Sequence, residues 1–104
     1  YAFGGALTAN TTVDNFNHYI LDVIAADKTI TLPAGTAGNS IRFTNMSSIN
    51  STGGYVASSY TWTINPNGSE KIMRSNTLVL DESTASFELF YSDATNGWIV
   101  NGTS

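Results

Sequence analysis

Apolar and polar residues alternate along six short segments of this chain, each of which ends at a turn. The segments are Thr29–Pro33, Ser40–Asn45, Thr61–Gly68, Thr77–Leu80, Ser86–Tyr91 and Gly97–Val100. Successive side chains on a strand point to opposite faces, so each segment can bury one face and expose the other. Such alternation is typical of antiparallel sheets with one solvated face. We therefore expect an all-β domain of six to eight short strands with almost no helix, a small antiparallel β-sandwich or jelly-roll-like barrel.

Turn-forming residues separate these segments. Asn67-Gly68 tolerates positive φ, and Asp93–Gly97 predicts a five-residue hairpin loop between the last two strands. Tyr19–Ile24 carries apolar residues on both faces, and its β-branched residues and short length favour a central strand over a helical turn. The long interval Met46–Ser59 predicts an exposed loop of the kind that often carries binding specificity.

The register of the expected strands divides their residues between a core and an outer face. The predicted core is Ile30, Leu32, Ile41, Phe43, Trp62, Ile64, Leu78, Leu80, Phe87, Leu89, Tyr91, Trp98 and Val100. The outer face is mostly polar, but Val79, Phe90 and Ile99 interrupt it. Either these three residues face another layer of the domain, or they form a subunit contact.

The length of 104 residues predicts one β domain, residues 18–104, preceded by an arm or docking segment, residues 1–17. Aromatic residues are rare in free tails, so we expect Tyr1, Phe3 and Leu7 to anchor the arm on this domain or on a neighbour. Because the first residue is Tyr rather than Met, we expect a chain that is processed or cut from a longer polypeptide.

Composition narrows the classes of partner. Eight acidic and four basic residues give a formal charge of −4, which disfavours nucleic acid. The apolar runs are too short for a transmembrane helix, so no membrane partner is expected. Charged residues make up only 12% of the chain, and Ser, Thr and Asn take their place, as suits an extracellular or virion-exposed surface.

Candidate catalytic chemistry is sparse, and we expect no enzyme, no metal site and no cofactor. The chain has one histidine, His18, and no cysteine, and it lacks a Gly-x-Ser-x-Gly elbow. The acidic residues near Asp81 and Asp93 do not form an Asp-x-Asp-x-Asp-Gly calcium loop, and turns account for them. Aromatic side chains could instead stack on sugars, and the register leaves Tyr55 and Tyr60 as the candidate glycan or receptor contacts.

The order of the segments from residue 28 to residue 100 resembles that of bacteriophage fibre and virion-decoration proteins. The phrases that carry the likeness are Thr29–Pro33, Ile41–Asn45, Ile64–Gly68, Leu78–Leu80, Ser86–Tyr91 and Gly97–Val100. Each phrase is short, so the likeness rests on their order and spacing. The long Met46–Ser59 interval and the arm depart from the pattern of a fibre tip.

The resemblance implies a non-enzymatic, homotrimeric β module on the virion surface. It would be a capsid decoration (cement) protein or a head-fibre or tail-fibre domain that contacts other capsid or fibre subunits. Oligomerisation also suits a small, cysteine-free domain, because burying more apolar area stabilises it. The alternative is a carbohydrate-binding module of a secreted or cell-surface protein, with a host-surface glycan as its ligand.

Overall fold

The chain folds into an all-β domain. The computed structural model describes residues 1–22, 24, 26–46, 61–80 and 86–103, and no helix occurs among them. The described residues form nine strands: β1 (Ala2–Leu7), β2 (Thr11–Thr12), β3 (Asn17–Leu21), β4 (Lys28–Thr31), β5 (Ser40–Asn45), β6 (Trp62–Asn65), β7 (Leu78–Leu80), β8 (Ser86–Asp93) and β9 (Gly97–Thr103). The predicted all-β class is therefore confirmed.

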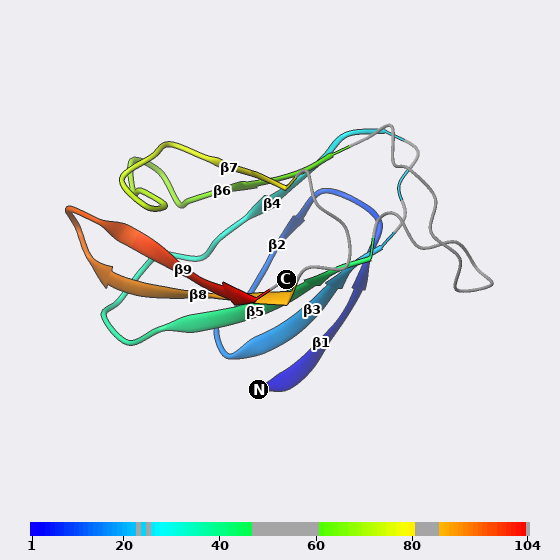
Figure 1. The fold of residues 1–104 in the computed structure, drawn as a ribbon, viewed down its shortest axis with the longest axis horizontal. Coiled ribbons are helices and arrows are strands. Elements are labelled where there is room, and N and C mark those ends of the chain that lie inside the picture. Colours follow the sequence, from blue (N-terminus) through cyan, green and yellow to red (C-terminus); the bar gives the residue numbers. More distant parts are fainter. Residues whose placement is uncertain (23, 25, 47–60, 81–85, 104) are drawn as a thin grey trace.

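The strands form two sheets that lie as two layers (Figure 1). The five-stranded sheet has the order β1-β3-β5-β8-β9, and the four-stranded sheet has the order β2-β4-β6-β7. From β1 to β6, each strand lies in the opposite sheet from the one before it. The chain thus winds back and forth between the layers and adds one strand to each sheet per turn.

This winding makes the first part of both sheets parallel, so the prediction of a wholly antiparallel fold is wrong. The pairs β1-β3, β3-β5, β2-β4 and β4-β6 are parallel, whereas β5-β8, β6-β7 and β8-β9 are antiparallel. Parallel strands usually alternate less clearly because helices cover both of their faces. Here the other sheet covers only one face of each strand, so apolar and polar residues alternate as they would in an antiparallel sheet.

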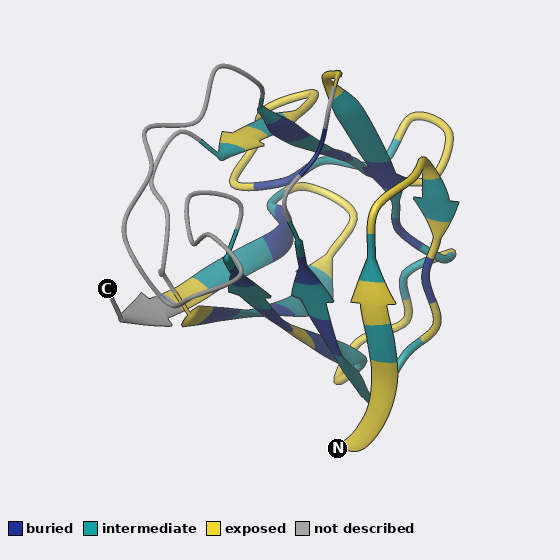
Figure 2. Cartoon of the chain, turned by 90° about the vertical axis from the view of Figure 1, so that its right-hand side faces the viewer, coloured by how far each residue is buried: buried dark blue, intermediate teal, exposed yellow. Residues whose placement is uncertain are grey.

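The core lies between the two sheets, where buried residues face one another (Figure 2). Ten residues of the predicted core are buried: Ile30, Leu32, Ile41, Phe43, Trp62, Ile64, Phe87, Leu89, Tyr91 and Trp98. The other three, Leu78, Leu80 and Val100, are partly buried and pack against that core. The prediction missed five buried residues, Val13, Tyr19, Leu21, Ile24 and Ile72. All but Ile72 come from the first quarter of the chain, where apolar and polar residues alternate least clearly.

Residues 1–17 contribute strands to both sheets. The strand β1 pairs with β3 at the edge of the five-stranded sheet, and β2 pairs with β4 at the edge of the four-stranded sheet. Val13 is fully buried in the core. Much of β1 is nevertheless exposed (Figure 2), and one side of its backbone pairs with no described strand.

Aromatic packing fixes the register of the five-stranded sheet. Tyr19, Phe43 and Phe87 are paired across β3, β5 and β8, and all three are buried. Their ring centroids are 5.9 Å apart for Tyr19 and Phe43 and 5.4 Å apart for Phe43 and Phe87. A shift of any strand by one residue would expose its ring, because alternate residues face opposite sides. The neighbouring residues are therefore held on the outer face.

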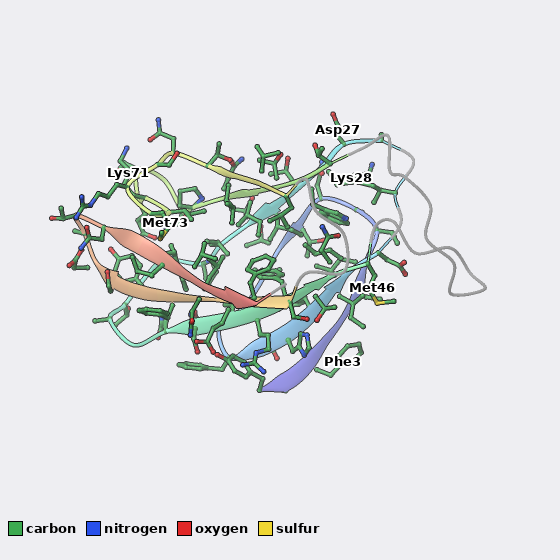
Figure 3. All side chains as sticks on the ribbon, in the orientation of Figure 1. Phe3, Asp27, Lys28, Met46, Lys71 and Met73 are labelled. Carbon is green, nitrogen blue, oxygen red and sulfur yellow. The ribbon has the colours of Figure 1, made fainter. Side chains whose placement is uncertain are left out.

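A tight turn at Met73-Arg74 packs against the start of β9, at the end of the molecule where β8 and β9 meet (Figure 3). The backbone N–H of Ile72 donates to Ser75 O, and the N–H of Ser75 donates to Ile72 O. The two residues enclosed by this pair, Met73 and Arg74, have φ values of 51° and 66°. Positive φ at both central residues defines a type I′ turn, in which Asn-Gly is the preferred sequence. Hydrogen bonds from Met73 N to Trp98 O and from Arg74 N to Asn96 O hold this strained pair in place.

Gly97 makes this contact possible. Its φ is 74°, and a Cβ built on it would lie 1.8 Å from the carbonyl oxygen of Lys71. That same oxygen accepts a 2.8 Å hydrogen bond from Trp98 N. A side chain at residue 97 would therefore push the Lys71 backbone away from β9.

We predict that Gly97→Ala lowers the free energy of unfolding by at least about 2 kcal/mol, because backbone strain and a backbone clash add. Gly68→Ala is the matched control, since Gly68 has a φ of 56° but nothing within 4 Å of a built Cβ. Its cost is about 1 kcal/mol, from strain alone. Urea denaturation measures both values. Equal costs for the two variants would contradict the close approach at Gly97.

We also predict that Arg74→Gly is more stable than Arg74→Ala by about 1 kcal/mol, because both must adopt the positive φ of this position and only Ala is strained by it. Both variants lose the 2.7 Å hydrogen bond from Arg74 Nε to Asn96 Oδ1, so their difference isolates the backbone. In regular strands and helices Gly is the less stable of the two. Denaturant unfolding measures the stability of both variants. If Arg74→Gly is the less stable of the two, the turn does not keep its positive φ and the prediction is contradicted.

Candidate binding face

The outer face of the five-stranded sheet carries a row of polar side chains across four neighbouring strands. His18 pairs with Arg42, Arg42 with Glu88, and Glu88 with Asn101, from β3, β5, β8 and β9 respectively. These residues alternate with the buried aromatic rings described above, which is why they point to solvent. They line a shallow hollow of about 290 Å³, together with Ser86 and Phe87. We call the four residues His18, Arg42, Glu88 and Asn101 the polar row.

Tyr1 lies over the polar row and ties two of its members together. The Tyr1 hydroxyl donates a hydrogen bond to a carboxylate oxygen of Glu88 and lies 2.8 Å from the Ser40 hydroxyl. The guanidinium carbon of Arg42 is 5.1 Å from the centroid of the Tyr1 ring, within the range of a cation–π contact. Arg42 also lies 3.9 Å from Glu88. Tyr1, Arg42 and Glu88 thus restrain one another.

A second line of hydrogen bonds runs beside this group. His18 Nε2 lies 2.8 Å from Thr44 Oγ1, which lies 3.2 Å from Ser86 Oγ. His18, Arg42, Glu88 and Ser86, which line the hollow, are therefore each restrained by a neighbour, which lowers the entropy that a ligand would have to remove on binding.

Two exposed aromatic rings lie on this face, Tyr1 over β5 and β8 and Phe3 on β1. Phe3 pairs with His18 and so continues the line of the polar row onto β1. It is 68% exposed, and its side chain lies outside the sheets (Figure 3). Tyr1 is 54% exposed, so its ring also remains open to solvent although it contacts Arg42. The face therefore combines fixed polar groups with an apolar border.

The three residues predicted as subunit contacts point away from the core, but they do not form one patch. Phe90 and Ile99 are paired across β8 and β9 on the outer face of the five-stranded sheet, and both are half-buried. Val79 is 52% exposed on β7, in the other sheet. None of the three belongs to the core cluster, so they do not face the other layer. Their role in a subunit contact stays a prediction.

The predicted anchoring residues separate into two groups. Tyr1 and Phe3 lie on or beside the polar row, whereas Leu7 packs partly buried against the core. Docking of this segment on another protein stays a prediction. The predicted glycan contacts Tyr55 and Tyr60, with most of the Met46–Ser59 interval, lie outside the described residues.

Sequence reasoning expected a mostly polar outer face but did not bring Arg42 and Glu88 together on it. It treated His18 as isolated, and it expected Tyr1 to pack on this domain or on a neighbour without identifying its partners. The alternation of β5 and β8 was sufficient to put both charges outside, but their pairing depends on which strands are neighbours. A charged pair of opposite sign at matching positions of two strands was the one signal that could have suggested it.

Comparisons with known proteins add no family to these observations. No protein-family model matches the chain, and the curated proteins include no significant match. Within the described part of the chain, no three His, Cys, Asp or Glu side chains gather as a metal site would require. Nor does that part contain a helix long and apolar enough to cross a membrane.

The neighbouring polar and charged groups of this face shift the pKa of Tyr1. Partial burial and then the hydrogen bond to Glu88 raise the pKa of the Tyr1 phenol, whereas Ser40 and Arg42 lower it, and the net shift is upward. Because folding favours the neutral phenol, this contribution to stability is fully present below a pH of about 10, the ordinary value for tyrosine. It is lost as the pH rises through the raised pKa.

We predict that Glu88→Gln lowers the pKa of Tyr1 towards its ordinary value, because the substitution removes a negative charge and keeps an acceptor oxygen. Arg42→Gln should raise the pKa further, since it removes a positive charge from the ring. NMR titration of the Tyr1 ring resonances in each variant measures both shifts. A Tyr1 pKa that is the same in all three proteins would contradict the contacts described here.

Proposed function

We propose that this chain is a non-enzymatic structural module of a bacteriophage particle. It acts as a homotrimeric capsid decoration or a head-fibre or tail-fibre domain on the virion surface. The observation that carries the proposal is the set of apolar side chains on outward faces of both sheets, which a monomer leaves in water.

The resemblance to virion modules supports this proposal because its phrases coincide with structural units. Thr29–Pro33 covers most of β4, Ile41–Asn45 covers most of β5, and the last three phrases lie on β7, β8 and β9. Ile64–Gly68 contains the end of β6 and the turn in which Glu70 N donates to Asn67 O. The order of phrases therefore reflects the order of strands in the fold.

The positions of the apolar contacts favour a ring over a two-fold dimer. A two-fold interface uses the same patch on both subunits, whereas a ring of three joins two different patches head to tail. Phe90 and Ile99 form one patch, and Val79 forms another in the opposite sheet. Three is the smallest number of subunits that closes such a ring.

The β1 edge suits contact with a second virion protein. Exposed edge strands normally carry charges or Pro that prevent pairing. Residues 1–13 contain no charged side chain and no Pro, and β1 leaves one side of its backbone unpaired by any described strand. A strand of a neighbouring capsid or fibre subunit could extend the sheet there.

We also propose that the domain is a sandwich rather than a jelly roll. A jelly roll consists of antiparallel Greek keys. The two facing layers and the parallel pairs of the first six strands support a wound sandwich closed by the antiparallel strands β7, β8 and β9.

We predict that the chain forms trimers at micromolar concentration and that Phe90→Ser with Ile99→Thr raises the dissociation constant by about tenfold or more. A tenfold rise in the dissociation constant corresponds to about 1.4 kcal/mol of binding free energy, and removing two apolar side chains from the contact costs at least that amount. Val79→Thr should act in the same direction because it changes the other half of the contact. Light scattering with analytical ultracentrifugation measures the association.

Thr63→Ser is the matched control, because Thr63 is paired with Val79 on β6 and β7 and the substitution removes no large apolar surface. It should leave the trimer intact. A wild-type chain that stays monomeric, both alone and with capsid or fibre subunits added, would contradict the proposed function.

A further inference from the structure

The hollow on the five-stranded sheet suggests a second function that does not depend on the proposed particle role. Its floor is the polar row, which spans four neighbouring strands. Strands lie about 4.8 Å apart, so the four side chains extend over roughly 14 Å. That length suits an extended ligand of a few units better than a single small molecule.

The row offers both donors and acceptors within short reach. Arg42 presents several N–H donors, Glu88 presents carboxylate acceptors, and Asn101 presents both. Neighbouring hydroxyl groups on a sugar require such mixed partners, because each hydroxyl both donates and accepts. Of these groups, Arg42 and Glu88 are already held in position by Tyr1 and by one another. A ligand would therefore meet a preorganised surface.

The aromatic border supplies the second requirement of sugar recognition. One face of a pyranose ring consists mainly of C–H groups, which pack on the face of an aromatic ring. Tyr1 and Phe3 are 54% and 68% exposed beside the row. Their rings lie within the same sheet face as the donors and acceptors, so one ligand can contact both kinds of group.

The charge of the row selects among possible ligands. Arg42 and Glu88 lie 3.9 Å apart with opposite charges, so the row has little net charge with which to attract an acidic ligand. The chain as a whole carries −4, which repels polyanions. From these features we infer that the polar row, with Tyr1 and Phe3, is a binding site for neutral oligosaccharides.

Two measurements test this site with the wild-type chain. A glycan array containing neutral and sialylated oligosaccharides finds ligands, and NMR titration with maltotriose, cellotriose, mannotriose and sialyllactose maps them. We expect neutral glycans to bind and to shift resonances of His18, Arg42 and Asn101. Binding of sialylated glycans alone, or of no glycan, would overturn the inference.

Variants then assign the binding to named groups. Arg42→Gln and Tyr1→Ala should each weaken binding of the neutral glycan by about tenfold, because each removes a hydrogen-bonding or stacking partner. Thr63→Ser, on the opposite sheet, should bind as the wild type does. Folding of every variant is checked from its NMR spectrum.

Two further results distinguish this site from a glycan site at Tyr55 or Tyr60 and from the proposed subunit contact. Binding that is lost in Tyr55→Ala or Tyr60→Ala but kept in Arg42→Gln and Tyr1→Ala would overturn the assignment. Light scattering of Arg42→Gln should still show the association state of the wild type. A failure of glycan binding in an intact trimer would therefore contradict this inference alone, and a glycan-binding monomer would contradict only the proposed particle role.

Discussion

The chain crosses from one sheet to the other after each of its first strands, and the rest of the structure depends on this crossing. Each of these strands must bury its inner face against the opposite layer, so residues from both sheets share one core. A 104-residue chain without cysteine has no disulfide to hold its layers together. Apolar packing between the sheets therefore carries most of the stability.

The same constraint explains the position of the candidate site. Because Tyr19, Phe43 and Phe87 must stack inside, the residues before or after them on each strand must lie outside. Arg42 and Glu88 then become cross-strand neighbours on the outer face. The site is thus a consequence of core register, and mutations of the polar row should alter binding with little effect on the fold.

Alternation predicted the strands but not their partners. It identified ten of the buried residues and placed Val79, Phe90 and Ile99 outside correctly, since burial depends only on which side a residue faces. Strand direction depends on pairing between segments that are distant in the sequence. The parallel pairs β3-β5 and β4-β6 are of this kind, and no local sequence pattern identifies their partners. The β8–β9 hairpin was predictable because Asp93–Gly97 is a short local turn, and the hairpin is present. Its loop is shorter than the predicted five residues, because Asp93 and Gly97 pair as strand residues and only residues 94–96 lie between them. The contact of Tyr1 with Glu88, 87 positions apart, could not be predicted.

The open edges of the two sheets are the places at which the proposed partners would add to this fold. The winding strands end at β1 on one side, where no charged residue protects the edge, and the antiparallel strands β7 and β9 end the sheets on the other side. The proposed glycan site and the apolar patch at Phe90 and Ile99 share one sheet face, but they lie on different rows. Because Glu88 and Phe90 are two residues apart on β8, the proposed subunit contact and the proposed glycan site are direct neighbours on this face.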